Sequence, residues 1–307
     1  MPVLNNEIAS AARFAVAATS SATLHAYRSD NRIFQKWCLE REVSALPALP
    51  STVAAFLAHE ADRGCRPSTL GRRLAAIRNT HRLSGVEPPT DTENVKTTLR
   101  GIRRTLGTAQ NRKTPATAEK ARTMAKSVPD SLVGARDRAI LLLGFAGAFR
   151  RSELVALNVA DLEPLPGGLR ITIRRSKTDQ EGQGKIIGIP FGSNDCPVEA
   201  VRTWLAASGI AQGPIFRSID RRGRLSVKRL SGRSVANIVK KYAKLAGWEP
   251  EAFSGHSLRS GFLTSAAANG ASIFKMMDLS RHKSADALRG YVSDADLLRN
   301  HAGLGLL

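Results

Sequence analysis

The residue types best suited to chemistry gather in the last third of the chain. The stretch S-G-H-S-L-R-S-G contains an H-x-x-R unit, His256 and Arg259, whose spacing predicts an imidazole and a guanidinium on one helical face. His282 follows, and Tyr291 lies nine positions after it. A phosphate-holding pair followed by a hydroxyl nucleophile indicates a site for attacking a phosphodiester.

Two further cations complete the candidate set. Arg150 begins an apolar helical segment in G-A-F-R-R-S-E-L, and Lys177 follows in R-S-K-T-D within a predicted hairpin. A guanidinium stays charged at any working pH and can clamp phosphate oxygens through two N–H groups, so Arg150 and Arg259 are the expected stabilisers of the transition state. Lys177 could protonate the leaving alkoxide, and His256 and His282 could bind the scissile phosphate or accept the tyrosine proton.

Each of these residues taken alone has an ordinary alternative. A single arginine is more often a surface or ion-pairing residue, Lys177 could be a solvated turn lysine, and either histidine could be structural. Neither an H-x-x-x-H unit nor a nearby Cys and Asp cluster is present, so no metal and no cofactor is expected. Of the three tyrosines, Tyr27 and Tyr242 are expected to be packing residues, which leaves Tyr291 as the nucleophile. Glu153, close to Arg150, could orient a cation of the site or form a structural ion pair.

The composition favours a polyanionic partner. Lys and Arg number 46 against 26 Asp and Glu, a net charge of +20, and such a protein gains affinity for nucleic acid when phosphates release their counterions. A basic protein that merely stays soluble is the alternative. No apolar run is long enough for a membrane span, no secretory signal is evident, and the three cysteines lack C-x-x-C spacing. A cytoplasmic protein is expected, associated with the nucleoid if its source is bacterial.

Apolar periodicity predicts a mainly α protein with a small β-hairpin in its second half, an α+β fold. Helices are expected at residues 21–41, 51–62, from 67 onward, and at 92–106, 118–126, 135–148, 150–158, 197–208, 231–246, 256–269 and 272–279. Alternating residues at 169–175 and a β-rich run at 185–190 predict the two strands of the hairpin. Residues 108–117 have no apolar periodicity and predict an exposed connector between two domains.

Two helices of the first domain carry basic residues beside their apolar stripes. The basic residues proposed as DNA contacts are Arg72, Arg73, Arg78, Lys96, Arg100, Arg103 and Arg104. A solvated helix face is the usual role of such charges. These stripes contain almost no acidic residues, which favours contact with a DNA backbone over that alternative.

The ordered set of candidate residues resembles the tyrosine recombinase (phage integrase) family. The resemblance lies in G-x-x-R-x-S-E-L, then S-K-T, S-G-H-S-x-R-S-G, R-H-K-S and G-Y, and it spans nearly the whole chain. The S-G-H-S stretch and the basic helix before the connector are similar to those of Cre and its relatives. Cre-type enzymes can carry Trp where this chain has His282, as most of the family does. The segment before Ser21 is too short for a separate arm-binding domain of the lambda type.

This resemblance implies a SAM-like helical core-binding domain over 1–107, a linker over 108–117 and a catalytic domain over 118–307 with a C-terminal tail helix. Tyr291 would attack DNA to leave a 3′-phosphotyrosine and a free 5′-hydroxyl, so that rejoining needs neither ATP nor metal. The implied partners are double-stranded DNA with a specific target site and further protomers, four in all, exchanging strands through a Holliday junction. The tail, residues 294–307, would dock on a neighbouring protomer, and packing on its own catalytic domain as a last core helix is the alternative. Neither a membrane nor a small-molecule substrate is implied.

Two other classes of function remain open from the sequence. A type IB topoisomerase uses a similar set of residues to nick and reseal one strand as a monomer. A DNA-binding regulator or accessory protein could use the same fold without catalysis.

Overall fold

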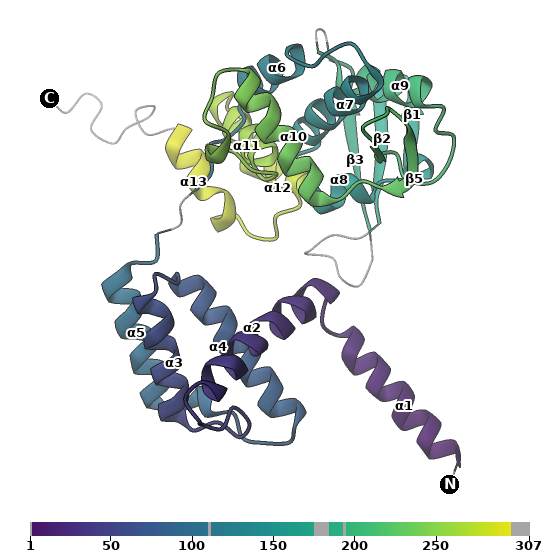
Figure 1. Ribbon diagram of the computed structural model, residues 1–307. Helices are drawn as coiled ribbons and strands as arrows, with labels where there is room; N and C mark the ends of the chain where they lie inside the picture. Colours follow the sequence, from purple (N-terminus) through teal and green to yellow (C-terminus); the bar gives the residue numbers. More distant parts are fainter. Residues whose placement is uncertain (1, 110–111, 175–183, 193–194, 296–307) are drawn as a thin grey trace, which may run out of the picture. The chain divides into compact units, whose positions relative to one another are not determined.

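The computed structural model describes residues 2–109, 112–174, 184–192 and 195–295 (Figure 1). The chain divides into two compact units, Met1–Asn111 and Arg112–Leu307. Lys177 and the segment 296–307, which includes most of the predicted tail helix, lie outside the described residues. No described helix is both long enough and apolar enough to cross a membrane.

The described part of the first unit is helical throughout. Its elements are α1 (Pro2–Ala17), α2 (Ser21–Leu39), α3 (Pro50–Asp62), α4 (Pro67–Leu83), the 3-10 turn η1 (Pro89–Asp91) and α5 (Glu93–Leu106). The sequence marks several starts, because the Ser20 hydroxyl accepts from the backbone N–H of Thr23 over 3.2 Å at α2, and a proline opens α3 and α4. The helix α1 was not anticipated.

Aromatic side chains form the centre of the first unit. The rings of Phe34 and Trp37 pack edge-on against Phe56 at centroid distances of 5.0 and 5.5 Å. Leu70 of α4 and Val95 of α5 are fully buried in the same cluster. The apolar stripes read from the sequence therefore do face one shared core.

The second unit combines helices with two small sheets. Its helices are α6 (Ala118–Lys126), α7 (Leu132–Ala146), α8 (Arg151–Ala156), α9 (Pro197–Ser208), α10 (Gly232–Leu245), α11 (Ser257–Ala268), α12 (Ile273–Ser280) and α13 (Asp286–Ala295), with 3-10 turns at Val159–Asp161 and Pro250–Ala252. Its strands are β1 (Leu162–Leu165), β2 (Gly168–Ile173), β3 (Lys185–Pro190), β4 (Arg217–Ile219) and β5 (Leu225–Arg229).

The predicted hairpin forms, as β2 and β3 of a three-stranded antiparallel sheet. Ile171 of β2 is the register partner of Leu162 in β1 and of Ile187 in β3. The strand β1 and the pair β4 and β5 were not predicted from the sequence. Only four, three and five residues long, they carry too short an alternation to stand out from loops.

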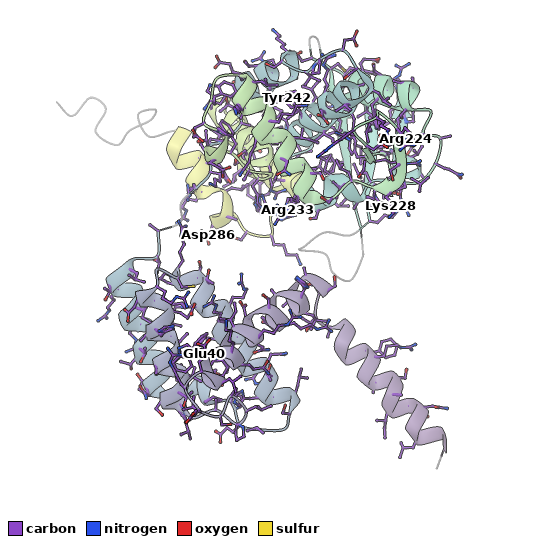
Figure 2. The ribbon with its side chains drawn as sticks, in the orientation of Figure 1. Glu40, Arg224, Lys228, Arg233, Tyr242 and Asp286 are labelled. Atoms are coloured by element: carbon purple, nitrogen blue, oxygen red, sulfur yellow. The ribbon has the colours of Figure 1, made fainter. Side chains whose placement is uncertain are left out.

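The helix α7 runs through the core of the second unit and explains why its pattern is almost uniformly apolar. Ile140, Leu141 and Leu143 are fully buried, as expected of a helix surrounded by protein. It begins at Leu132 rather than at residue 135, because the Ser131 hydroxyl caps it by accepting from Gly134 N–H over 3.1 Å. Tyr242 of α10 (Figure 2) is buried in the same region, and its hydroxyl donates to Asp137 over 3.0 Å.

The second half of the predicted connector is not an exposed linker. The backbone N–H of Ala116 donates to the Ser257 carbonyl over 2.8 Å, and Ala116 is fully buried. A Cβ on Gly261 would lie 1.7 Å from the Ala116 carbonyl oxygen, so the close crossing needs glycine in the S-G of α11. The expectation failed because a segment without apolar periodicity can still be buried through its backbone.

Candidate active site

Arg150 lies at the start of a short helix and is held by its own acidic neighbour. It is the N-cap residue of α8, and its backbone N–H donates to Glu153 Oε2 over 3.0 Å. Its Nη1 donates to Glu153 Oε1 over 2.6 Å. Burial alone would raise the pKa of the Glu153 carboxyl, but Arg281 and Arg150 hold that pKa below its usual value. Glu153 is therefore a carboxylate that orients Arg150, one of the two roles considered from the sequence.

Arg259 comes from a different helix and joins the same group of side chains. It lies in the first turn of α11 and is only 4% exposed. Its Nη1 donates to the Ala148 carbonyl over 2.7 Å, and its Nη2 lies 3.1 Å from His282 Nε2. Arg259 thus connects the turn before Arg150 with the end of α12.

The ring of His282 is oriented by Ser280, a residue the sequence did not single out. The Ser280 hydroxyl donates to the Met276 carbonyl over 2.6 Å, so its oxygen is left to accept from His282 Nδ1, 2.7 Å away. We therefore assign the proton of the neutral ring to Nδ1 and the lone pair to Nε2. Burial, followed by Arg259 and Arg150, lowers the pKa of His282 to about 4. At neutral pH the ring is therefore neutral, and Nε2 is a hydrogen-bond acceptor.

A third guanidinium, absent from the sequence prediction, completes this group. Arg281 is 7% exposed and donates to Glu153 Oε2 over 2.7 Å and to the Ala148 carbonyl over 2.9 Å. It is the first residue of the R-H-K-S stretch, but the sequence gives it no role, because its partners lie 128 and 133 positions earlier in the chain. Only the tertiary structure brings these residues together.

The resulting cluster has an unbalanced positive charge. Among the described residues, three guanidiniums, those of Arg150, Arg259 and Arg281, share one carboxylate, that of Glu153, a surplus of two positive charges beside a neutral His282. Burial, with repulsion from Arg150 and Arg281, lowers the pKa of Arg259 to about 9. A partly buried excess of cations is stabilised by an anion, and a phosphodiester matches the paired N–H groups of guanidinium.

Tyr291 lies on α13, close enough to this cluster to act on it electrostatically. Its ring is half-buried against a small apolar cluster that includes Leu263, Met276 and Leu288, contributed by α11, α12 and α13. Its phenol is among the groups that raise the pKa of Arg259. The apolar cluster thus holds the candidate nucleophile beside the helix that carries Arg259.

The two remaining residues predicted for the site are His256 and Lys177. His256 is the N-cap residue of α11, three positions before Arg259, and its side chain is exposed whereas Arg259 is buried. Its backbone N–H donates to the Ser254 hydroxyl over 3.1 Å. Lys177 lies outside the described residues, so its general-acid role stays a prediction.

We expect His282 to make folding stability depend on pH. Its folded pKa of about 4 lies below the unfolded value of 6.5, so the unfolded chain binds more protons between these values. The free energy of unfolding should therefore fall as pH drops from about 6.5 to about 4, with no further loss from this residue below that. His282→Gln removes this titration, and urea unfolding across pH should show a shallower decline in the variant. Identical slopes in both proteins would contradict the prediction.

The basic residues of the first unit have acidic partners that the sequence did not reveal. Arg72 donates to Asp30 Oδ2 over 2.7 Å, Arg73 pairs with Glu60, and Arg78 donates to Asp91 Oδ1 over 2.5 Å. The premise that these stripes lack compensating acids is wrong, because the acids that pair with the arginines of α4 come from α2, α3 and η1 rather than from α4 itself. On α5, Arg100 pairs with Glu93 over 3.2 Å.

These pairs divide the proposed DNA contacts into two groups. The side chain of Arg73 is 11% exposed and pairs with Glu60, whose side chain is 10% exposed. This buried ion pair gives Arg73 a structural role. Lys96, Arg103 and Arg104 are exposed on α5. They stay predicted backbone contacts, together with Arg72, Arg78 and Arg100.

We expect Arg73→Met to loosen the first unit rather than to weaken DNA contact directly. Removing one partner of a buried ion pair leaves the other charge uncompensated, which costs about 3 kcal/mol. Amide hydrogen exchange in α3 and α4 should then accelerate by roughly 10²-fold. Arg104→Met, on the exposed stripe, should leave exchange unchanged and weaken DNA binding. The reverse pattern would make Arg73 a DNA contact.

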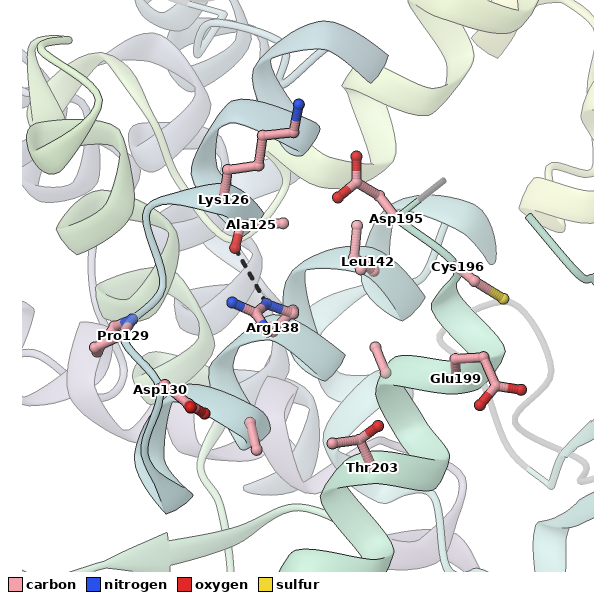
Figure 3. A pocket seen from close by; sticks show the side chains of 12 residues that line it. Ala125, Lys126, Pro129, Asp130, Arg138, Leu142, Asp195, Cys196, Glu199 and Thr203 are labelled. Carbon is pink, nitrogen blue, oxygen red and sulfur yellow. Dashed lines mark hydrogen bonds between the residues drawn. The ribbon is translucent and has the colours of Figure 1, made fainter. Parts of the chain in front are cut away.

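A separate cavity of about 300 Å³ lies between α6, α7 and α9. Lys126, Asp130, Asp195 and Glu199 line it, and Arg138 donates to the Ala125 carbonyl at its wall over 3.3 Å (Figure 3). Its lining mixes both signs of charge and includes none of the predicted site residues. This cavity is therefore not part of the candidate active site.

Comparison with known proteins shows which family this chain matches. Residues 114–297 match the phage integrase family, and residues 14–83 match the phage integrase N-terminal SAM-like domain. The chain is 40% identical over 286 residues to an integrase/recombinase xerD homolog of Selenomonas ruminantium, covering 91% of this chain and 84% of the relative. It is 25% identical over 285 residues to recombinase cre of Escherichia phage P1, covering 86% and 82%.

Solved structures show the same fold. A lambda integrase dimer bound to a COC′ core site aligns with a TM-score of 0.61 at 18% identity, over 90% of this chain and 73% of that chain. The likeness to Cre expected from the sequence is present, and the xerD homolog is more similar in sequence. With a family match over most of its length and a cluster of Arg150, Arg259 and His282 beside Tyr291, the chain belongs to the phage integrase family of tyrosine recombinases.

Proposed function

We propose that this protein is a site-specific DNA recombinase in which Tyr291 attacks a scissile phosphate. The observation that carries the proposal is the buried cluster of Arg150, Arg259 and Arg281, with its surplus of two positive charges, beside the helix that bears Tyr291. A phosphodiester gains negative charge at its non-bridging oxygens when a nucleophile attacks. Fixed guanidiniums stabilise that charge without reorganising.

The hydrogen bonds of the cluster support separate roles for its members. Each terminal nitrogen of a guanidinium carries two hydrogens. Arg259 uses one on each to hold Ala148 and His282, and Arg150 donates from Nη1 to Glu153 and from Nη2 to the Arg281 carbonyl over 3.4 Å. Both arginines keep N–H groups for phosphate oxygens. His282 Nε2 carries the lone pair of the neutral ring, which supports acceptance of the phenolic proton, and the protonated ring can then donate a hydrogen bond to the phosphate.

The proposed reaction balances without an energy source. Attack by the Tyr291 oxygen, which gives up the phenolic proton, forms a 3′-phosphotyrosyl ester and breaks the bond from phosphorus to the 5′-oxygen, and that oxygen takes a proton to leave as a 5′-hydroxyl. Attack of a partner strand's 5′-hydroxyl on the same ester reverses these changes and restores a phosphodiester. Because one ester replaces another at each step, neither ATP nor a metal ion is needed to drive it.

The proposal also includes the DNA substrate, the assembly of protomers and the place of the reaction. The net charge of +20 suits a duplex DNA substrate carrying a specific site. We propose that four protomers assemble on two sites and exchange strands in pairs through a Holliday junction. The domain limits of 1–107 and 118–307 belong to this proposal, as does a reaction in the cytoplasm at the nucleoid.

A trapping experiment tests this function. Randomised duplexes are first selected by binding to Tyr291→Phe, and the wild-type protein is then given the selected duplex with a nick near the cleavage point. Loss of the short cleaved piece should leave a covalent adduct resistant to detergent, with the DNA attached to the peptide that contains Tyr291. Two sites on one supercoiled plasmid should then yield recombinant products. Relaxation without recombinants would instead indicate a type IB topoisomerase, and binding without an adduct an accessory protein.

Lys177 is proposed as the general acid that protonates the leaving 5′-oxygen. Lys177→Ala should slow cleavage of normal DNA but cleave a duplex with a 5′-bridging phosphorothiolate at nearly the wild-type rate, because a thiolate departs without a proton. The ratio of the two single-turnover rates measures this rescue. Equal defects on both substrates would remove Lys177 from that role.

A further inference from the structure

Within the described residues, the guanidinium of Arg281 makes more hydrogen bonds than that of Arg150 or Arg259. Its Nη1 donates to the Gly147 carbonyl over 3.1 Å and to the Leu279 carbonyl, and its Nη2 donates to the Ala148 carbonyl over 2.9 Å and to Glu153 Oε2 over 2.7 Å. These four contacts use both hydrogens on each terminal nitrogen. Those nitrogens are therefore committed to the protein, in contrast to those of Arg150 and Arg259.

The backbone at this position is strained. Arg281 ends α12 with φ 60° and ψ 41°, in the left-handed region that favours glycine. Ala148, whose carbonyl it binds, also has a positive φ, of 45°. A side chain with a Cβ is disfavoured in this region, and such strain persists where the surroundings hold it in place.

Apart from Leu279, the hydrogen-bond partners of Arg281 lie in one segment of the chain. Gly147 and Ala148 precede Arg150 and Glu153 follows it, and the Arg281 guanidinium also lies 5.2 Å from the centroid of the Phe149 ring. The main-chain carbonyl of Arg281 accepts from Arg150 Nη2 over 3.4 Å. This single residue therefore contacts the segment that bears Arg150 through both its side chain and its backbone.

Arg281 also connects that segment to the other half of the site. The Ala148 carbonyl accepts from Arg281 Nη2 and from Arg259 Nη1, so its position sets both guanidiniums. His282 is the next residue in the chain, and its backbone N–H donates to the Met277 carbonyl over 3.2 Å. A shift of Arg281 would displace Arg150, Arg259 and His282 relative to one another.

We propose that Arg281 is a positioning residue, which locks the end of α12 onto the turn between α7 and α8 and so sets the spacing of Arg150, Arg259 and His282. The inference rests on the proposed cleavage of DNA for its effect on rate. Arg281 acts through these residues and does not itself contact the phosphate through its terminal nitrogens. Misplacement of such groups by about 1 Å is enough to slow a reaction by roughly 10²-fold.

The test compares Arg281→Met, Arg281→Lys and Arg281→Gly with wild type on the nicked duplex. Methionine keeps apolar bulk without charge, lysine keeps one charge but cannot reach four acceptors, and glycine relieves the left-handed strain while removing the guanidinium. Single-turnover cleavage should fall by roughly 10²-fold in the Met and Gly variants, and Lys should restore only a small part of it. Affinity for an uncleaved duplex should stay within about two-fold, since the binding surface is unchanged.

Arg136→Met is the matched control. Arg136 is a buried arginine of the same unit that pairs with Asp137 over 2.7 Å and donates to the Arg217 carbonyl over 3.3 Å, away from the described cluster. It should lower stability yet leave the cleavage rate of the folded protein unchanged. Equal losses of cleavage rate in Arg136→Met and Arg281→Met would show that removing any buried arginine slows cleavage. That result would overturn the positioning role of Arg281.

A titration without DNA separates this inference from the proposed function. Glu153, Arg150, Arg259 and Arg281 are the charged groups that act on His282. Loss of Arg281 removes one cation and frees Glu153, so NMR titration should show the pKa of His282 rising above about 4. A wild-type protein that never forms an adduct would defeat the proposed function, whereas this shift would still be measured. Unchanged cleavage and an unchanged His282 pKa in Arg281→Gly, or failure of every Arg281 variant to fold, would overturn the inference.

Discussion

Tyr291→Phe is expected to abolish covalent adducts and recombination while leaving DNA binding intact. The change removes only the hydroxyl, and the ring keeps its contacts with the apolar cluster of α11, α12 and α13. Without the phenolic oxygen no phosphotyrosyl ester can form, so the loss should be complete rather than partial. Detergent-resistant adducts on a nicked duplex measure the chemistry, and gel retardation of an intact duplex measures the binding.

Tyr242→Phe is the matched control for this experiment. Tyr242 is fully buried and its hydroxyl donates to Asp137 over 3.0 Å. Burial, with the nearby Asp137 carboxylate, raises the pKa of Tyr242, so its hydroxyl is a poor nucleophile. The variant should form adducts at the wild-type rate. Adducts formed by Tyr291→Phe, with the DNA attached to another peptide, would show that a different residue is the nucleophile.

Arg259→Lys is expected to slow cleavage by roughly 10²-fold or more, the scale for removing one donor that stabilises a transition state. Lysine keeps the charge but has a single ammonium nitrogen. It cannot bind the Ala148 carbonyl and His282 Nε2 together, as Nη1 and Nη2 of Arg259 do at 2.7 and 3.1 Å, and still present paired N–H groups to a phosphate. The defect should appear in the single-turnover rate and not in affinity for uncleaved DNA.

Arg138→Lys provides the comparison. Arg138 also donates from its guanidinium to two groups, the carbonyls of Ala125 and Val128 at 3.3 and 3.1 Å, but it lies at the separate cavity between α6, α7 and α9. The same loss of a forked donor there should leave cleavage unchanged. Near-normal cleavage by Arg259→Lys would remove Arg259 from the proposed clamp.

The sequence determined most of the helices and the candidate chemistry. Amphipathic periodicity located α2 to α5 and most of the second unit, because the interval between apolar residues reports which face of a helix is buried. Motifs identified Arg150, Arg259, His282 and Tyr291, and the structure brings the first three into one hydrogen-bonded group. Short strands and the crossing of Ala116 over α11 left no comparable periodic signal.

Only the tertiary structure decided which charges are partnered and which groups position the site. Arg73 was assigned to DNA with its neighbours, yet its ion pair with Glu60 comes from another helix. The R-H-K-S stretch gives Arg281 no role, because its partners Gly147, Ala148 and Glu153 lie 128 to 134 positions earlier in the chain. Periodicity reports burial along a single element. Hydrogen bonds and ion pairs depend on the distance between elements, which is set only when their apolar faces pack together.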